Sequence, residues 1–108
     1  MNAPSDNESW IIDAGVAVIL KKAEEGISSL SPLERLIYCF WVADYGMRNA
    51  GDLGAAFDLY PDFQHEAAAL AGSLAFPFTQ ESFFLAASTL QQEYFQRFDR
   101  ICNELKCA

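Results

Sequence analysis

Few side chains in this sequence could carry out chemistry, and the most regularly spaced set is acidic. Asp58, Asp62 and Glu66 follow one another at intervals of four residues. On a continuous helix, that spacing would place the Cβ atoms of neighbouring carboxylates about 5 to 6 Å apart. Pro61 interrupts such a helix, but if both segments face one way, the carboxylates form a row that is similar in sign and spacing to nucleic-acid phosphates. A simply solvated acidic face is the alternative.

Neither a metal site nor a catalytic nucleophile is indicated. His65 is the only histidine, and a transition-metal site normally takes three or four ligands that include several His or Cys residues. Cys39 lies among aromatic residues in an apolar run, which predicts burial, whereas a catalytic thiolate must be accessible and close to a base. We therefore expect no catalytic residue, no metal and no cofactor, and hence a protein that is not an enzyme.

Asp44 has the least ordinary position among the carboxylates. It continues the apolar stripe of Leu33, Ile37 and Trp41 by about one turn. We expect it to lie at the end of a helix, where its oxygens accept hydrogen bonds from backbone N–H groups of the following turn. An acid–base role is the less favoured alternative. The predicted partner-binding residues are acidic throughout: Asp44, Asp52, Asp58, Asp62 and Glu66.

Net charge limits the kinds of partner. The chain has a formal charge of −8, and residues 44–66 hold five acidic side chains against one basic side chain. Binding to nucleic acid needs clustered Lys and Arg, and an anionic membrane surface would repel this chain. A basic protein is the compatible partner, although solubility alone would also account for the acidity.

Length and composition predict one folded domain. The chain has 108 residues, of which 52% are hydrophobic and 14% aromatic, so it can bury a substantial core. We expect a flexible N-terminus over residues 1–8 and a single helical domain over residues 9–108. Three cysteines without a CxxC motif argue against a disulfide framework. With no signal segment and no apolar stretch of about 18 residues, we expect a cytoplasmic location.

Periodicity and capping predict an all-α bundle of about five helices around a central apolar helix over about residues 32–45. Ser31 as N-cap, Pro32 at the first helical position and Glu34 three residues after the serine make the strongest helix start in the chain. The unbroken apolar run 36–43 follows, so this helix should be enclosed by others. A change of direction is expected over residues 46–52.

Four further helical segments are expected to surround that helix. The first spans about residues 9–25 and ends at Gly26, and its inward stripe is predicted to be Trp10, Ile11, Ala14, Ala17 and Val18. The others span about residues 52–59, residues 63–75, and one helix or a pair from Thr79 to the end. In the last segment, Glu93 with Arg97 and Arg100 with Glu104 are expected to form solvent-facing pairs.

Residues 30–38, Trp41 and residues 47–51 together resemble a small all-helical bacterial family that includes a DNA-mimic protein. In that family, a helix of this character leads into a corner of the Val-Asn-Asn-Gly-Gly-Phe type. The corner is matched at Met47, Asn49 and Gly51. It departs from the pattern at Arg48, Ala50 and Asp52. The resemblance covers roughly residues 28–75 and implies a compact helical domain, often dimeric, whose acidic surface can occupy the DNA-binding face of a basic regulator.

Three functional hypotheses follow. The first is a non-enzymatic interaction domain that presents the acidic region 44–66 to a basic DNA-binding protein, as a DNA mimic would. The second is an immunity or antitoxin-type protein that covers the basic active site of a nuclease; both predict binding that weakens with salt. The third is a small-ligand carrier or enzyme with a pocket among Trp41, Tyr45 and Phe57.

Overall fold

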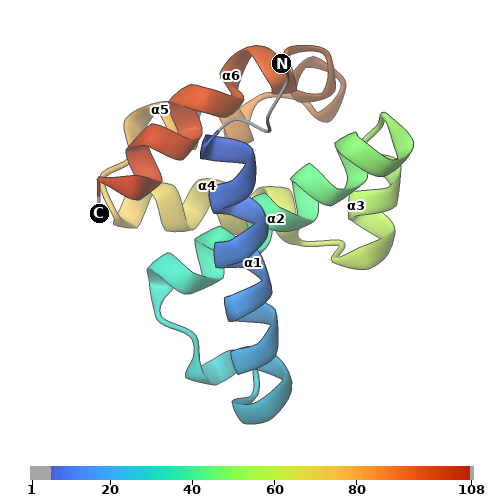
Figure 1. Cartoon of the computed structure of the whole chain (residues 1–108). Helices are drawn as coiled ribbons and strands as arrows, with labels where there is room; N and C mark the ends of the chain where they lie inside the picture. Colours follow the sequence, from blue (N-terminus) through green and yellow to red (C-terminus); the bar gives the residue numbers. More distant parts are fainter. Residues whose placement is uncertain (1–5, 108) are drawn as a thin grey trace.

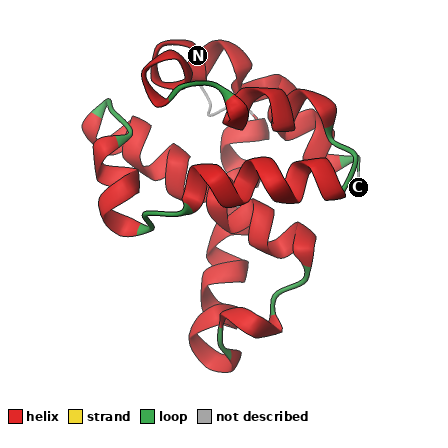
Figure 2. Ribbon diagram, turned by 180° about the vertical axis from the view of Figure 1, so that it is seen from behind, coloured by secondary structure: helices red, strands yellow, loops and turns green. Residues whose placement is uncertain are grey.

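The chain folds into helices throughout residues 6–107, the part that the computed structural model describes (Figures 1 and 2). No strand occurs in this part of the chain, so the predicted all-α class is confirmed. None of the described helices combines the length and hydropathy needed to cross a membrane. The elements are α1 (Asp6–Glu25), the 3₁₀ helix η1 (Ile27–Ser29), α2 (Pro32–Ala50), α3 (Gly54–Leu59), α4 (Phe63–Ser73), α5 (Pro77–Phe84) and α6 (Ala87–Lys106).

Helix α2 is the centre of the fold and begins as the sequence predicts. The Ser31 hydroxyl accepts a hydrogen bond from the Glu34 N–H at 3.2 Å, and Glu34 accepts one from the Ser31 N–H at 2.8 Å. This capping box satisfies donors that the first helical turn would otherwise leave unpaired. Helices α1, α3, α4 and α6 all contact α2, and residues 36–40 are buried among them. The prediction of a central, enclosed helix is therefore confirmed.

The predicted end of the central helix is wrong. Helix α2 does not stop near residue 45 but continues to Ala50, and the left-handed Gly51 (φ 74°) ends it. Gly46 is buried inside the helix, and a Cβ atom there would lie 2.9 Å from the backbone nitrogen of Ala56. The glycine therefore permits the close approach of α3 rather than a turn.

Helix α1 begins earlier than predicted and crosses α2 closely. Residues 6–8, which we expected to be irregular, form its first turn, whereas residues 1–5 lie outside the described residues. Gly26 (φ 88°) follows the last helical residue, as predicted. A Cβ atom at Gly15 would lie 2.2 Å from the Trp41 ring, so α1 and α2 can meet here only because residue 15 is glycine. Ala17, predicted to face inward, is exposed.

Helices α3 and α4 are separated at Pro61, as predicted, and they cover one side of α2 (Figure 1). Phe63, Ala67 and Ala71 are fully buried, and the small side chains of the two alanines allow α4 to pack closely. The helix ends at Ser73, two residues before the predicted end. Ala75 then adopts a left-handed conformation (φ 62°).

The C-terminal segment forms a pair of helices, α5 and α6, that are joined through one carboxylate. Glu104 on α6 accepts hydrogen bonds from the N–H groups of Phe78 (3.0 Å) and Thr79 (2.7 Å) in the first turn of α5. The expected pair of Arg100 with Glu104 is therefore wrong, because Glu104 caps α5 and the Arg100 guanidinium lies 4.2 Å from the centre of the Phe78 ring. The other expected pair, Glu93 with Arg97, is confirmed at 2.9 Å.

Candidate functional site

Asp44 is buried, as predicted, but its partners are side chains rather than backbone N–H groups. Its Oδ1 atom accepts a hydrogen bond from the Tyr94 hydroxyl at 2.7 Å, and the Arg48 Nε donates to both carboxylate oxygens at 2.9 and 3.0 Å. Burial raises the pKa of Asp44, and it raises the pKa of Tyr94 well above its ordinary value. This group links α2 to α6 and leaves Asp44 no open surface on which a partner could bind.

The Glu66 carboxylate is also bound by side chains of the fold. Its Oε1 atom lies 2.9 Å from Arg35 Nη2, and its Oε2 atom accepts a hydrogen bond from the Tyr60 hydroxyl at 2.5 Å. Burial, with the hydrogen bond to Glu66 second, raises the pKa of Tyr60 to about 12. The network joins α2, the end of α3 and α4. Glu66 therefore belongs to the packing of these helices, and the predicted row of three carboxylates loses its third member.

The other three predicted partner-binding residues lie on the surface. Asp52, Asp58 and Asp62 are exposed, and none forms an ion pair with a described residue. Asp52 accepts a long hydrogen bond (3.4 Å) from the N–H of Ala55 near the start of α3. Asp62 occupies the N-cap position of α4 without a side-chain capping bond. We call these three residues the acidic edge.

All of the chain's basic side chains make an interaction within the fold. The seven Lys and Arg residues lie in the described part of the chain. Four form ion pairs with carboxylates: Lys21, Arg35, Arg48 and Arg97. The other three lie over aromatic rings: Lys22, Arg100 and Lys106. None of these ion pairs involves the acidic edge, so its three carboxylates are exposed without a bound basic side chain among the described residues.

The residues considered for catalysis do not assemble into a site. Cys39 is fully buried in the core, and burial raises the pKa of its thiol, so the reactive thiolate is disfavoured. His65 is exposed on α4. Among the described residues, no group of three His, Cys, Asp or Glu side chains is placed to hold a metal ion.

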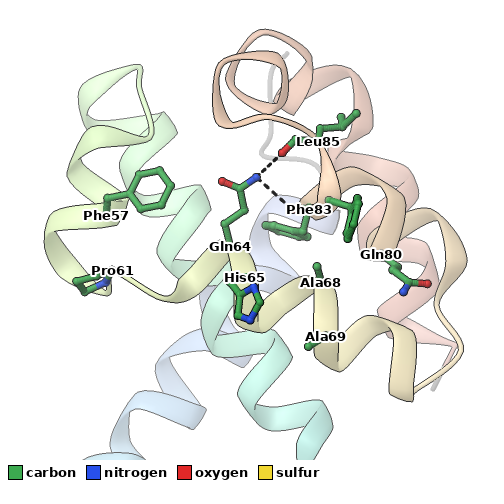
Figure 3. Close-up of a pocket in the computed structure, with 10 residues that line it drawn as sticks. Phe57, Pro61, Gln64, His65, Ala68, Ala69, Gln80, Phe83 and Leu85 are labelled. Carbon is green, nitrogen blue, oxygen red and sulfur yellow. Dashed lines mark hydrogen bonds between the residues drawn. The ribbon is translucent and has the colours of Figure 1, made fainter.

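A groove that the sequence analysis missed lies between α3, α4 and α5 (Figure 3). We call it the α4–α5 groove; its volume is about 440 Å³. Trp41 and Tyr45, expected to form a pocket with Phe57, stack on each other with ring centroids 5.4 Å apart, and only Phe57 lines the groove. The lining residues are Phe57, Pro61, Gln64, His65, Ala68, Ala69, Gln80, Phe83, Phe84 and Leu85.

One signal for this groove was present in the sequence. Phe83 and Phe84 are consecutive, and side chains of adjacent helical residues point about 100° apart, so on a helix that packs through one narrow face the two rings cannot both be buried. Phe83 is 2% exposed and Phe84 is 81% exposed. The exposed ring therefore marked a surface feature at the end of α5, although its surroundings depend on α4.

No protein-family model, curated protein or solved structure matches this chain. The DNA mimicry and the dimer that the sequence resemblance implies therefore stay predictions.

Proposed function

We propose that this protein is a non-enzymatic interaction domain that binds a basic protein through its acidic edge, Asp52, Asp58 and Asp62. One observation carries the proposal: every basic side chain is engaged inside the fold, whereas these three carboxylates are exposed and unpaired among the described residues. Unbalanced surface charge of one sign attracts an oppositely charged partner and raises its association rate.

The position of the acidic edge supports the same proposal. Its three residues lie within the segment 52–62, which contains α3 and the turns on either side of it, at the right of Figure 1. The partner would be a DNA-binding regulator, and the protein would compete with DNA for its basic surface.

A nuclease is the second partner class that the same charges allow. In that case the protein would be an immunity or antitoxin-type inhibitor, and its binding would block the nuclease's basic active site. We place either interaction in the cytoplasm, where the exposed Cys107 would stay a thiol.

The test compares two variants that remove the same number of negative charges. One replaces Asp52, Asp58 and Asp62 with Asn. The control replaces three exposed α1 acids that also form no ion pair within the described residues: Asp13, Glu24 and Glu25. Each variant and the unaltered protein are immobilised and exposed to nuclease-treated lysate of the native host, followed by washes at stepped salt concentrations.

We expect the acidic-edge variant to lose the captured basic protein at lower salt than the unaltered protein, with an affinity about tenfold weaker for the purified pair. The α1 control should behave like the unaltered protein. Equal losses in both variants would show that only net charge matters, and no loss in either would contradict the proposal. DNA should compete with the protein for either partner; a captured protein that cleaves DNA and is inhibited on binding is a nuclease, and one that binds DNA without cleaving it is a regulator.

A further inference from the structure

The wall of the α4–α5 groove is held in place by one side chain. The amide nitrogen of Gln64, on α4, donates hydrogen bonds to the backbone oxygens of Phe83 (3.1 Å) and Leu85 (2.6 Å) at the end of α5. Figure 3 shows the amide oxygen of Gln64 turned away from these two residues, toward the side of Phe57. Its nitrogen is used within the fold, so the oxygen remains as an acceptor for an N–H group that enters the groove.

Phe84 stands at the border of two hollows. It lines the α4–α5 groove and also a second hollow of about 380 Å³, which Pro77, Gln80, Glu81 and Leu85 complete. A phenylalanine that is 81% exposed is unfavourable in water, so covering its ring would favour binding. Exposed aromatic rings beside hollows are typical of the residues that carry most of the affinity at protein interfaces.

The charges around the groove indicate which kind of partner segment could bind in it. No Lys or Arg lines either hollow, and Glu81, on the second hollow, has a side chain that is 63% exposed although it forms an ion pair with Arg97 at 3.1 Å. Asp58 and Asp62 directly follow the lining residues Phe57 and Pro61 in the chain. A largely apolar lining without Lys or Arg, followed along the chain by exposed acidic residues, complements an apolar side chain that has basic neighbours. A second copy of this acidic chain, with a charge of −8, would be repelled.

We propose that the α4–α5 groove is the docking site for a segment of a basic partner protein that inserts one large apolar side chain between Phe57 and Phe84. Lys or Arg residues beside the inserted side chain then face Asp58 and Asp62, and a backbone N–H of the segment donates to the Gln64 oxygen. The groove volume of about 440 Å³ suits one such side chain with part of its backbone. This inference rests on the proposed function and adds to it an apolar anchor, which charge alone would not require.

Three short fluorescein-labelled peptides with blocked ends test the proposal by fluorescence anisotropy. The first places one Trp between two Lys-Arg pairs, the second replaces the Trp with Ser, and the third keeps the Trp but replaces the basic residues with Glu. We expect the first peptide to bind at least tenfold more tightly than each of the others. A Trp-independent affinity would overturn the groove proposal while leaving the charge-driven function standing. Equal affinity of both Trp peptides would overturn the charge selection, and failure of the first peptide to bind would overturn the whole inference.

Two variants localise the binding. Ala69 is exposed and lines the groove, so Ala69→Trp fills the groove without entering the core, and it should weaken the first peptide at least tenfold. Ala23→Trp is the matched control, at an exposed α1 position outside the groove lining, and it should bind as the unaltered protein does. Phe84→Ala removes a ring that the fold does not bury and should also weaken binding. Unchanged affinity in both Ala69→Trp and Phe84→Ala would refute the assignment of the site.

Discussion

Replacing Asp44 with alanine should lower the free energy of unfolding by about 3 to 5 kcal/mol. The change leaves the Tyr94 hydroxyl, in a side chain that is 0% exposed, without its acceptor, and it removes the carboxylate 2.9 Å from Arg48 Nε. An orphaned buried polar group costs about 1 to 3 kcal/mol, and breaking a buried ion pair from one side costs about 3 to 5 kcal/mol. The two costs overlap, so they are not summed. A domain of this size has a total stability of about 5 to 15 kcal/mol, so the loss is a large fraction.

Urea denaturation followed by circular dichroism measures this loss. Asp13→Ala is the matched control, because Asp13 is exposed on α1 and forms no ion pair with a described residue. It should change the free energy of unfolding by less than about 0.5 kcal/mol. A loss below about 1 kcal/mol for Asp44→Ala would refute the reasoning, since it would mean that the buried hydroxyl finds another partner without cost.

Tyr94→Phe separates the hydroxyl from the ion pair. It keeps the ring in the core and leaves Asp44 paired with Arg48, so the expected loss is about 1 to 3 kcal/mol. The double variant should cost less than the sum of the single variants, with a coupling of about 0.5 to 3 kcal/mol. Strict additivity would show that the two side chains stabilise the protein independently.

The direction of the Asp44 pKa shift determines whether this residue makes the folded protein more or less stable as the pH falls. Burial raises this pKa in the folded state above its value in the unfolded chain. Protonation of Asp44 therefore adds stability that is fully present below the unfolded-state pKa and is lost as the pH rises through the folded-state pKa. Asp44→Asn cannot titrate, so the stability of the unaltered protein relative to this variant should increase as the pH falls through that window. A difference that shrinks on acidification would contradict the direction of the shift.

Three further outcomes are expected. Ser31→Ala should cost about 1 kcal/mol in urea denaturation by removing the α2 capping box, whereas Ser31→Asp should retain most of the stability. Gly15→Ala should cost about 1 to 3 kcal/mol and change the tryptophan fluorescence, because its Cβ atom must displace the Trp41 ring; an unchanged spectrum would argue against the close helix crossing. In the native protein a thiol-reactive dye should label the exposed Cys107 rapidly, while Cys39 and the other buried thiol react only after unfolding.

The local signals of the sequence determined the helical class and the starts of α2 and α4, whereas α1 begins three residues earlier than predicted. Ser31 and Glu34 are three residues apart, so their reciprocal hydrogen bonds form within a single turn and can be predicted without knowledge of the rest of the chain. Gly26 ends α1 for an equally local reason, because its left-handed backbone conformation is one that other residues rarely adopt. The buried stripe of α6 also follows from helical periodicity, since Leu90, Tyr94 and Phe98 recur every four residues and all three are buried.

The predicted end of the central helix was wrong because a glycine can serve close helix packing as well as a turn. Gly46 was interpreted as part of a turn, but it lies inside α2 where the backbone of α3 approaches. Whether a glycine permits a positive φ angle or a close contact depends on what lies opposite, and at Gly46 that is Ala56, ten residues later in the chain. Helical periodicity alone could not distinguish the two uses.

The charges show most clearly what only the tertiary structure decided. The sequence alone determined that the region 44–66 is acidic and that a basic partner is compatible with it. In the folded protein, two of these carboxylates are bound by other side chains. Asp44 pairs with Arg48 and Tyr94. Glu66 pairs with Arg35 and Tyr60. Tyr94 follows Asp44 by 50 residues and Arg35 precedes Glu66 by 31, so packing between helices, rather than spacing along one helix, decides which charges reach the surface. The α4–α5 groove arises in the same way, from elements whose mutual placement is set by the core beneath them.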